Sequence, residues 1–500
     1  MAEQRIPDVH DEEAAPFWGS RAAVQLESSI EISDPVDLLD GGGSSPLWWK
    51  RSPEEVAPDT LGRWRTRQNL TGASLPQIRR GLAQAWRLVL GSQIDEALEA
   101  IERLELQFDD VPPATARRFR RATQLLRAAG LAFEDDSLGA LAITRSHLKE
   151  NGTTQHCHVA STICRIGLWR LGEFDCFHSL PRLQPRMRWS KSWAVSAMLD
   201  MSIEAAVALD RLHLSTARRL ASDALQVAKA VPKEAAGLAA LPARVVAQVF
   251  YGEGCLDQAD QILRDQLPVI NAKGPIDAAL RAYLILTRIA KHRMQYDFAA
   301  LLLREAEALG ERRRWPRLVA ACLAERTLLL LQRGQTQKAR LVLEYLDRYA
   351  EARRKGSGHS ASEVNRYRAL SHWRVSWAET PSAEAVVGLR QLYHQAIEKG
   401  DFYAGCALAV DLVETLVAIG ESEEADALLS HTIRTAAVAG LYQVFLEGGP
   451  GSGELLRRAY ARAAATDRDV LPFVEACFRN GVPVAQAAPL RSPAAASAIR

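Results

Sequence analysis

The chain has 500 residues, of which 48% are apolar and 24% are charged, as is ordinary for a soluble folded protein. This length exceeds the size at which a single core stops growing, so several domains or an elongated repeat are expected. The formal net charge of +2 excludes a global field that recruits nucleic acid or an anionic membrane. Ala and Leu dominate the apolar residues and favour helices over strands, which predicts an all-α fold.

Residues 1–74 differ in composition from the rest of the chain. Acidic stretches, the run Gly41–Ser45 and several prolines predict a largely disordered leader. Within it, Trp48, Trp49 and Trp64 are expected to cap the apolar edge of the first repeat, with a partner-binding motif as the alternative. The N-terminus lacks the pattern of a signal peptide, and no apolar run reaches the length of a membrane span. A cytoplasmic protein without membrane association is expected.

A repeat of about forty residues runs through the middle of the sequence. Its unit is a loop, usually opened by Gly, followed by a small or apolar residue near the start of a second helix, as in Gly254 to Ala259 and Gly334 to Ala339. These anchor residues recur 37 to 46 residues apart at positions 97, 140, 177, 217, 259, 299, 339, 385 and 425, with weaker copies at Ala140, Ala217 and Ala385. This spacing predicts helical hairpins that stack into a solenoid over residues 75–480.

Each part of the repeat has a physical role. A Gly after the first helix can adopt the left-handed conformation that ends it, and a small anchor lets the paired helices approach closely. A hairpin cannot bury its own apolar face, so neighbouring hairpins must stack into a superhelix with a concave inner surface. The first helix of each hairpin is expected to line that surface, which is the predicted binding site.

Tryptophan and arginine occur together on several expected first helices. Such residues can hold an anionic or aromatic ligand, or a partner peptide. The alternative is that these tryptophans fill the core between paired helices, as expected for Trp86. The candidate ligand- or partner-binding residues are Trp169, Arg188, Trp189, Trp193, Trp373, Arg374 and Trp377.

Other local patterns give no specific site. The seven scattered cysteines indicate reduced core residues, and the spacing of His156, Cys157, His158 and Cys164 matches no closed zinc motif. Arginine clusters at 117–121, 312–314 and 353–354 are expected to be solvated helix faces or loops. Lys355–Ser362 is expected to be a mobile loop, and Gly448–Gly453 a turn between helices rather than a phosphate loop.

The Gly-to-Ala anchors resemble the tetratricopeptide motif, although that unit usually has about 34 residues. Longer, degenerate repeats resemble the sensor region of bacterial LuxR-family regulators of the maltose-activator type. The segment Ala439–Pro450, followed by Leu455 and Leu456, is similar to the closing segment of that region. The resemblance covers roughly residues 75–480 and implies a right-handed superhelical solenoid that senses a signal.

The sequence departs from that family's usual organisation at both ends. Members of the family carry a nucleotide-binding module before the sensor and a helix-turn-helix after it. No G-x-x-x-x-G-K-[ST] loop occurs in the sequence, and residues 481–500 form an Ala- and Pro-rich stretch that is expected to be a flexible tail. The expectation is a stand-alone or remnant sensor.

The predicted function is therefore non-catalytic and regulatory, in bacterial transcription. No catalytic motif is present, and neither a cofactor nor a metal is expected. The concave groove would bind a small effector or a protein partner, and self-association is left open. One alternative is a constitutive protein scaffold that senses nothing, and another is direct nucleic-acid binding through the arginine clusters, which is disfavoured by the carboxylates beside them.

Overall fold

The computed structural model describes residues 75–149, 155–180, 191–353, 359–447 and 452–481. In these ranges the chain forms α-helices and three short 3-10 helices, and no strand. The prediction of an all-α fold is confirmed. The predicted leader at 1–74 and the predicted tail at 481–500 lie outside the described residues, except that Gly481 is the last residue of a helix.

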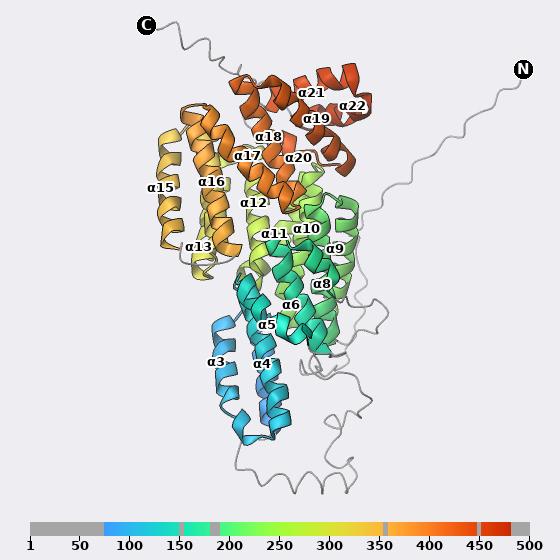
Figure 1. The fold of residues 1–500 in the computed structure, drawn as a ribbon, viewed down its shortest axis with the longest axis vertical. Coiled ribbons are helices and arrows are strands. Elements are labelled where there is room, and N and C mark those ends of the chain that lie inside the picture. Colours follow the sequence, from blue (N-terminus) through green and yellow to red (C-terminus); the bar gives the residue numbers. More distant parts are fainter. Residues whose placement is uncertain (1–74, 150–154, 181–190, 354–358, 448–451, 482–500) are drawn as a thin grey trace, which may run out of the picture. The chain divides into compact units, whose positions relative to one another are not determined.

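The described helices pair into nine successive hairpins, drawn in Figure 1, followed by three closing helices. The first helices are α2 (Leu75–Leu90), α4 (Pro113–Phe133), α6 (Gln155–Leu171), α8 (Lys191–Asp210), α10 (Ala240–Gly252), α12 (Ile276–His292), α14 (Pro316–Gln332), α16 (His359–Glu379) and α18 (Phe402–Ile419). The second helices are α3 (Ile94–Glu105), α5 (Ser137–Lys149), α7 (Phe174–Ser179), α9 (Leu214–Ala228), α11 (Leu256–Lys273), α13 (Tyr296–Arg312), α15 (Thr336–Ala352), α17 (Ala383–Glu398) and α19 (Ser422–Ala439). The closing helices are α20 (Gln443–Leu446), α21 (Ser452–Thr466) and α22 (Leu471–Gly481), and the 3-10 helices are η3 (Phe108–Asp110), η4 (Lys233–Ala239) and η5 (Arg468–Val470).

The first helices form one continuous layer. From α2 to α16, each first helix contacts the first helix of the next hairpin, while each second helix packs on its own first helix. The first helices in the middle of the array are buried along most of their length, as α10, α12 and α14 show. This arrangement confirms the prediction of a solenoid built from helical hairpins.

The anchor residues occupy one fixed place in the hairpin. Eight of the nine are the fourth residue of a second helix and are fully buried: Ala97, Ala140, Phe177, Ala217, Ala259, Ala299, Ala339 and Ala425. The assignment of Ala385 is wrong by one residue. Ser382 caps α17 by accepting a hydrogen bond from the backbone N–H of Ala385, so the helix starts at Ala383 and its fourth residue is Val386, which is 2% exposed.

The turn inside the hairpin has a left-handed residue two positions before the second helix. Gly254 and Gly334 hold this position, with φ of +79° and +69°. In other hairpins the residue is not glycine, and Asp135 adopts φ +73° there. In the first hairpin Ser92, at φ +60°, takes the place that the repeat pattern predicts for Gly91. Glycine is therefore favoured at this turn but not required by it.

The segment before α16 also differs from expectation. The sequence predicts a loop over Lys355–Ser362, but α16 begins at His359, and residues 354–358 lie outside the described part. The His359 side chain is buried and contacts the guanidinium of Arg317 on α14. This contact packs the first turn of α16 against the neighbouring hairpin, so the prediction is wrong for residues 359–362.

Hairpins four or five positions apart also contact each other. The backbone N–H of Tyr442 donates to the carbonyl of Gly252 at 2.8 Å, and Leu441 is fully buried in a core that joins α8–α10 to α17–α22. In the N-terminal half, Ser92 Oγ donates to the carbonyl of Lys273 at 2.9 Å, and Arg313 donates to the carbonyl of Ser92 at 3.1 Å. The fold therefore has long-range contacts as well as contacts between neighbouring hairpins.

Two described stretches are long and apolar enough to pass a membrane-span test, Lys233–Gly252 and Phe402–Ile419. Within the protein, 83% of the apolar window of the first stretch is buried, and 50% of the apolar window of the second stretch is buried. Core helices pass the same test, so these stretches are weak evidence for a membrane span.

Candidate functional site

A charged cavity lies among the first helices of six consecutive hairpins. Its volume is about 100 Å³. The walls come from α6, α8, α10, α12, α14 and α16, together with the turns before α7 and α18. The lining residues are Trp169, Arg170, Gly172, Phe174, Asp210, Arg244, Asp277, Leu280, Arg281, Arg317, His359, Glu363, Arg366, Tyr367, Lys399 and Asp401.

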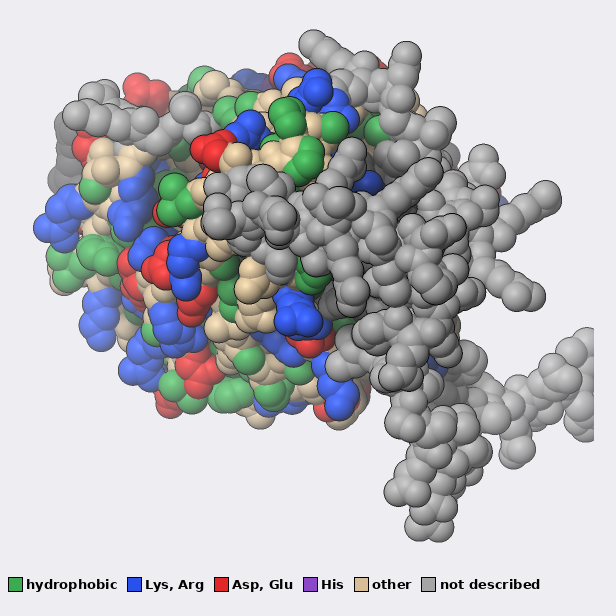
Figure 2. All heavy atoms as spheres, turned by 90° about the horizontal axis from the view of Figure 1, so that it is seen from below, with side chains coloured by type: hydrophobic (Ala, Val, Ile, Leu, Met, Phe, Trp, Pro, Cys, Tyr) green, Lys and Arg blue, Asp and Glu red, His purple; other side chains and the backbone are tan. Residues whose placement is uncertain are grey.

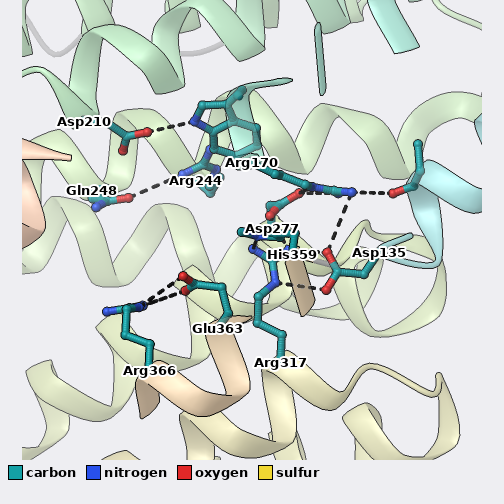
Figure 3. A network of polar contacts seen from close by, with 12 residues as sticks. Asp135, Arg170, Asp210, Arg244, Gln248, Asp277, Arg317, His359, Glu363 and Arg366 are labelled. Atoms are coloured by element: carbon teal, nitrogen blue, oxygen red, sulfur yellow. Dashed lines mark hydrogen bonds and ion pairs between the residues drawn. The ribbon is translucent and has the colours of Figure 1, made fainter. Parts of the chain in front are cut away.

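Asp277 is the centre of the polar network shown in Figure 3. Its Oδ2 accepts hydrogen bonds from Arg170 Nε at 3.1 Å and Nη2 at 2.6 Å, and its Oδ1 accepts one from Arg317 Nη2 at 2.7 Å. Burial opposes ionisation of this carboxyl, but Arg170 and Arg317 outweigh it and hold its pKa well below the usual range. Asp277 is therefore a buried carboxylate with two charged partners.

The turn before α5 contributes a second carboxylate to this network. Asp135 accepts hydrogen bonds from Arg317 Nε at 3.1 Å and Nη2 at 2.7 Å. It is 3% exposed and is the left-handed residue of its turn, a conformation that Asp tolerates better than most residues. Arg317 thus joins Asp277 to Asp135, and Arg170 joins the same cluster to the carbonyl of Ala132 at 2.6 Å.

On the other side of the cavity, α16 presents its own ion pair. Glu363 accepts from Arg366 Nε at 3.0 Å and Nη2 at 2.8 Å. Burial would raise the pKa of Glu363, but Arg366 and other cations lower it to about 2. His359 lies one turn earlier on the same helix, and burial together with the nearby Arg317 lowers its pKa to about 3. At neutral pH, His359 is therefore uncharged.

Trp169 and Asp210 form the wall on the α6 and α8 side. The indole N–H of Trp169 donates to Asp210 Oδ2 at 2.8 Å. Burial, and then repulsion from Asp401, raises the pKa of Asp210 to about 7. The guanidinium of Arg244 lies over the same indole ring, 5.2 Å from its centroid. Figure 3 shows the Arg244 side chain beside the indole that contacts Asp210.

A second charged cluster lies further along the same layer of helices. Glu325 on α14 accepts from Arg288 at 3.1 Å and lies 3.7 Å from Lys291, and Arg288 also contacts Glu447 at 3.3 Å. Burial would raise the pKa of Glu325, but Arg288 and Lys291 lower it to about 2. These residues tie α12, α14 and the segment after α20 together.

The structure separates the predicted binding residues. Trp169 lines the cavity, whereas Trp373, Arg374 and Trp377 on α16 do not. Trp373 packs against the hydrophobic core that joins α8–α10 to α17–α22, and its buried indole N–H has no hydrogen-bond partner. Arg374 is near the Glu325 cluster, and burial lowers its pKa. Trp377 is half-buried.

The other predicted residues give no test of the site. Arg188 and Trp189 lie outside the described residues, and Trp193 belongs to α8, but its side chain is not described. Trp86, predicted to be a core residue, is 4% exposed, which confirms that interpretation.

Sequence reasoning missed the charged residues of the cavity. Arg244 is the one charged residue in α10, and Asp277 stands at the start of the largely apolar α12. A single charge inside an apolar helix is costly to bury without a partner. That pattern could have indicated Arg244 and Asp277, but their partners come from helices far away in the sequence.

The arginine clusters are partly used for internal contacts. Arg313 donates to backbone carbonyls of the first and fifth hairpins, and Arg314 pairs with Asp95 at 3.7 Å. Arg120 pairs with Asp109 at 2.9 Å, and Phe119 is buried between its basic neighbours. Figure 2 shows basic and acidic side chains interspersed on the face that it presents, outside the atoms drawn in grey. In the described part of the chain, no group of three or more His, Cys, Asp or Glu is placed to hold a metal ion.

Comparisons with solved structures support the fold. A Rap protein complexed with Competence and Sporulation Factor aligns with a TM-score of 0.53 at 12% identity, over 73% of this chain and 99% of that chain. The Rap conjugation gene regulator of the plasmid pLS20 with the Phr* peptide aligns with a TM-score of 0.41 at 14% identity, over 73% of this chain and 96% of that chain. The apo form of RapI aligns with a TM-score of 0.34 at 11% identity, over 80% and 97%. The first of these likenesses shows a shared helical-repeat fold.

A search of curated proteins finds no match. The family model described as the MalT-like TPR region matches residues 178–462. This match begins in α7, spans the hairpins from α8 to α19, and ends in α21. Since it covers more than half of the sequence, the chain belongs to the family of MalT-like TPR regions.

Proposed function

We propose that this protein is a non-catalytic regulator whose inner cavity binds a small effector or a segment of a protein partner. The observation that carries the proposal is the cavity itself, which is lined by charged groups, four of them buried: Arg170, Arg244, Asp277 and Arg317. A ligand there contacts many repeats at once, so its binding energy can favour one packing of the hairpins over another. Membership of the MalT-like TPR family supports a regulatory role.

The finer parts of the proposed function are a role in bacterial transcription and a cytoplasmic location. The likeness of Ala439–Pro450 to the closing segment of maltose-activator sensors favours a role in bacterial transcription within the LuxR family. A cytoplasmic location fits that role. The similar fold of a Rap protein whose structure contains Competence and Sporulation Factor shows that such a helical repeat can accommodate a bound regulatory factor.

A constitutive scaffold is the second candidate function. Large apolar side chains are exposed on the second helices, among them Leu341, which is 63% exposed, and Val387, which is 62% exposed. Exposed apolar groups on a repeat surface are suited to protein contacts. A scaffold of this kind would bind its partner through α15 and α17 and would not need the cavity.

The two functions can be separated by thermal unfolding of the full chain with a panel of metabolites and peptides. Effector binding predicts a saturable rise in Tm for one ligand class, because a ligand that binds only the native state stabilises it. Arg281→Trp places a bulky side chain on the cavity wall and should abolish the rise for a ligand of any charge. The matched control is Arg304→Trp, at an exposed position on α13, which should leave it intact.

The opposite outcome would favour the scaffold. In that outcome, no ligand class raises the Tm. A protein partner from the native host binds the wild type and Arg281→Trp with equal affinity but does not bind Leu341→Asp. The cavity would then not be the functional site.

A further inference from the structure

The cavity contains positive charge that the protein does not neutralise. Six of its lining side chains are cationic and four are carboxylates. Arg170 and Arg317 pair with Asp277 and also with Asp135, which is not itself a lining residue, and Arg366 binds Glu363. The remaining three cations, Arg244, Arg281 and Lys399, make no ion pair with any carboxylate in the described part of the chain.

Arg244 is the most unusual of the three, because it is 3% exposed. Its Nε has no hydrogen-bond partner, and its one hydrogen bond is a long one of 3.5 Å from Nη1 to Gln248 Oε1. A buried guanidinium without an anion is strongly unfavourable. Burial lowers the pKa of Arg244 to about 10, and repulsion from Arg281 and Arg317 adds to this shift, whereas Asp277 opposes it. A lowered arginine pKa is expected where cations outnumber anions.

Arg281 and Lys399 extend this positive charge towards solvent. Arg281 is half-buried on α12, one turn after Asp277, and makes no hydrogen bond in the described structure. Lys399 is exposed at the end of α17, and its backbone packs against the turn at Gly172. The three cations therefore run from the buried wall of the cavity to its exposed edge.

The carboxylates that remain have other partners. Asp210 accepts from the indole of Trp169, and Asp401 caps α18 by accepting from the N–H of Ala404 at 3.0 Å. Because the pKa of Asp210 is raised to about 7, this group is partly protonated at neutral pH and neutralises the arginines incompletely.

We propose that the cavity is an anion-binding site, in which Arg244 and Arg281 hold a carboxylate or phosphate group of a compact ligand and Lys399 lies at the entrance. Guanidinium groups bind these planar or multi-oxygen anions through paired hydrogen bonds. A volume of about 100 Å³ accommodates several water molecules, and therefore a compact acid rather than a folded polypeptide. The inference rests on the proposed function and defines the chemistry of its ligand.

The site would connect the two sides of the cavity. Arg244 lies on α10 and Arg281 on α12, while Lys399 and Asp401 lie in the turn between α17 and α18. An anion between them would neutralise the positive charges of Arg244, Arg281 and Lys399, which come from the fifth, sixth and eighth hairpins. Binding would therefore favour the arrangement in which these hairpins approach one another.

The test measures binding of inorganic phosphate, succinate and the neutral probe glucose to the full chain by calorimetry at constant ionic strength. Phosphate or succinate should bind saturably, and the comparison between them separates a phosphate ligand from a carboxylate ligand. Arg281→Gln should weaken binding at least about tenfold, because one charge-assisted contact is lost. Arg304→Gln removes an exposed arginine from α13 and should leave the affinity unchanged.

Arg244→Gln supplies a readout that a merely structural arginine would not give. It should abolish anion binding and leave the Tm of the ligand-free protein equal to or above that of the wild type, because an unpaired buried charge is removed. Equal affinity of the wild type and Arg281→Gln for the anions, or no anion binding at all, would overturn the proposal. Saturable glucose binding that is lost in Arg281→Trp but kept in Arg281→Gln would overturn the anion site while supporting an effector cavity.

Discussion

At the scale of single residues, Asp277 combines two charged partners with almost complete burial. It is 5% exposed and accepts from both Arg170 and Arg317. An ion pair of this kind adds little compared with apolar packing, but removing one partner leaves the other charges buried and unpaired. The stability of the inner layer therefore depends on this carboxylate much more than on any surface ion pair.

We expect Asp277→Asn to lower the free energy of unfolding by about 3 kcal/mol, since two buried guanidinium groups lose one of their two anions and keep only Asp135. The measurement is urea unfolding at pH 7. The control is Asp297→Asn. The Asp297 side chain is fully exposed, and its ion pair with Arg333 is long, at 4.0 Å. Losing this surface ion pair should change the free energy of unfolding by less than about 0.5 kcal/mol. Equal effects of the two substitutions would show that the Asp277 network does not stabilise the fold.

His359 gives the inner layer a defined dependence on pH. Its pKa in the folded protein is about 3, below the usual value of about 6.5, so the unfolded state takes up a proton first as the pH falls. The contribution of neutral His359 is complete above pH 6.5 and is lost progressively as the pH falls from 6.5 towards 3.

We therefore expect the stability difference between wild type and His359→Gln to shrink by about 1.4 kcal/mol between pH 7.5 and pH 5.5, from the linkage of one proton. Urea unfolding of both proteins at the two pH values measures it. Substitution of the exposed His431 on α19 by Gln serves as the control and should change stability by less than about 0.5 kcal/mol at pH 7.5. A constant difference for His359→Gln would mean that His359 takes up its proton over the same pH range in the folded and the unfolded state, which would contradict its lowered pKa.

At the scale of the helical elements, the hairpin can be predicted well from the sequence because its determinants are local. The fourth residue of each second helix is small or apolar and fully buried in eight of nine hairpins. The errors have local causes too. Ser92, and not the predicted Gly91, adopts the left-handed turn of the first hairpin, as Leu212 and Met294 do in hairpins whose turn has no glycine.

Close approach of the paired helices at the anchor predicts intolerance of larger side chains there. Ala299→Leu on α13 should lower the free energy of unfolding by about 1–3 kcal/mol, because added methyl groups overpack a site with no exposed surface. Ala308→Leu on the exposed side of the same helix should stay within about 0.5 kcal/mol of the wild type. Urea unfolding would contradict the role of the anchor if both changes had the same effect.

The candidate site could not be predicted to the same extent. The co-occurrence of Trp and Arg on first helices indicates Trp169, and this residue does line the cavity. The same rule indicates Trp373, which packs into a core instead. The rule does not distinguish cavity positions from core positions, because on a first helix these differ only in what the distant hairpins place opposite them. Asp277 and Arg317, for example, are 40 residues apart, and Arg317 and Asp135 are 182 residues apart.

At the scale of the whole described array, the contacts between distant hairpins distinguish this protein from a simple repeat in which each unit contacts only its neighbours. In a simple array, a destabilising change loosens the mutated hairpin and those beside it. Here Leu441 follows α19 and lies against Gly252 at the end of α10, beside the hydrogen bond from the N–H of Tyr442 to the Gly252 carbonyl. The last hairpins and the middle hairpins therefore share one core.

Leu441→Ala should lower stability by about 2–5 kcal/mol, because it leaves a cavity at a fully buried position. Its effect should also reach beyond the neighbouring helices. Hydrogen exchange followed by mass spectrometry should show faster exchange in α10 as well as in α18–α20, since opening of the C-terminal core exposes both. Leu346→Ala, at an equally buried position on α15, should speed exchange only in α14–α16. If α10 kept its protection in Leu441→Ala, the distant contact would not couple the two parts of the array, and a ligand in the cavity would have to act on neighbouring hairpins alone.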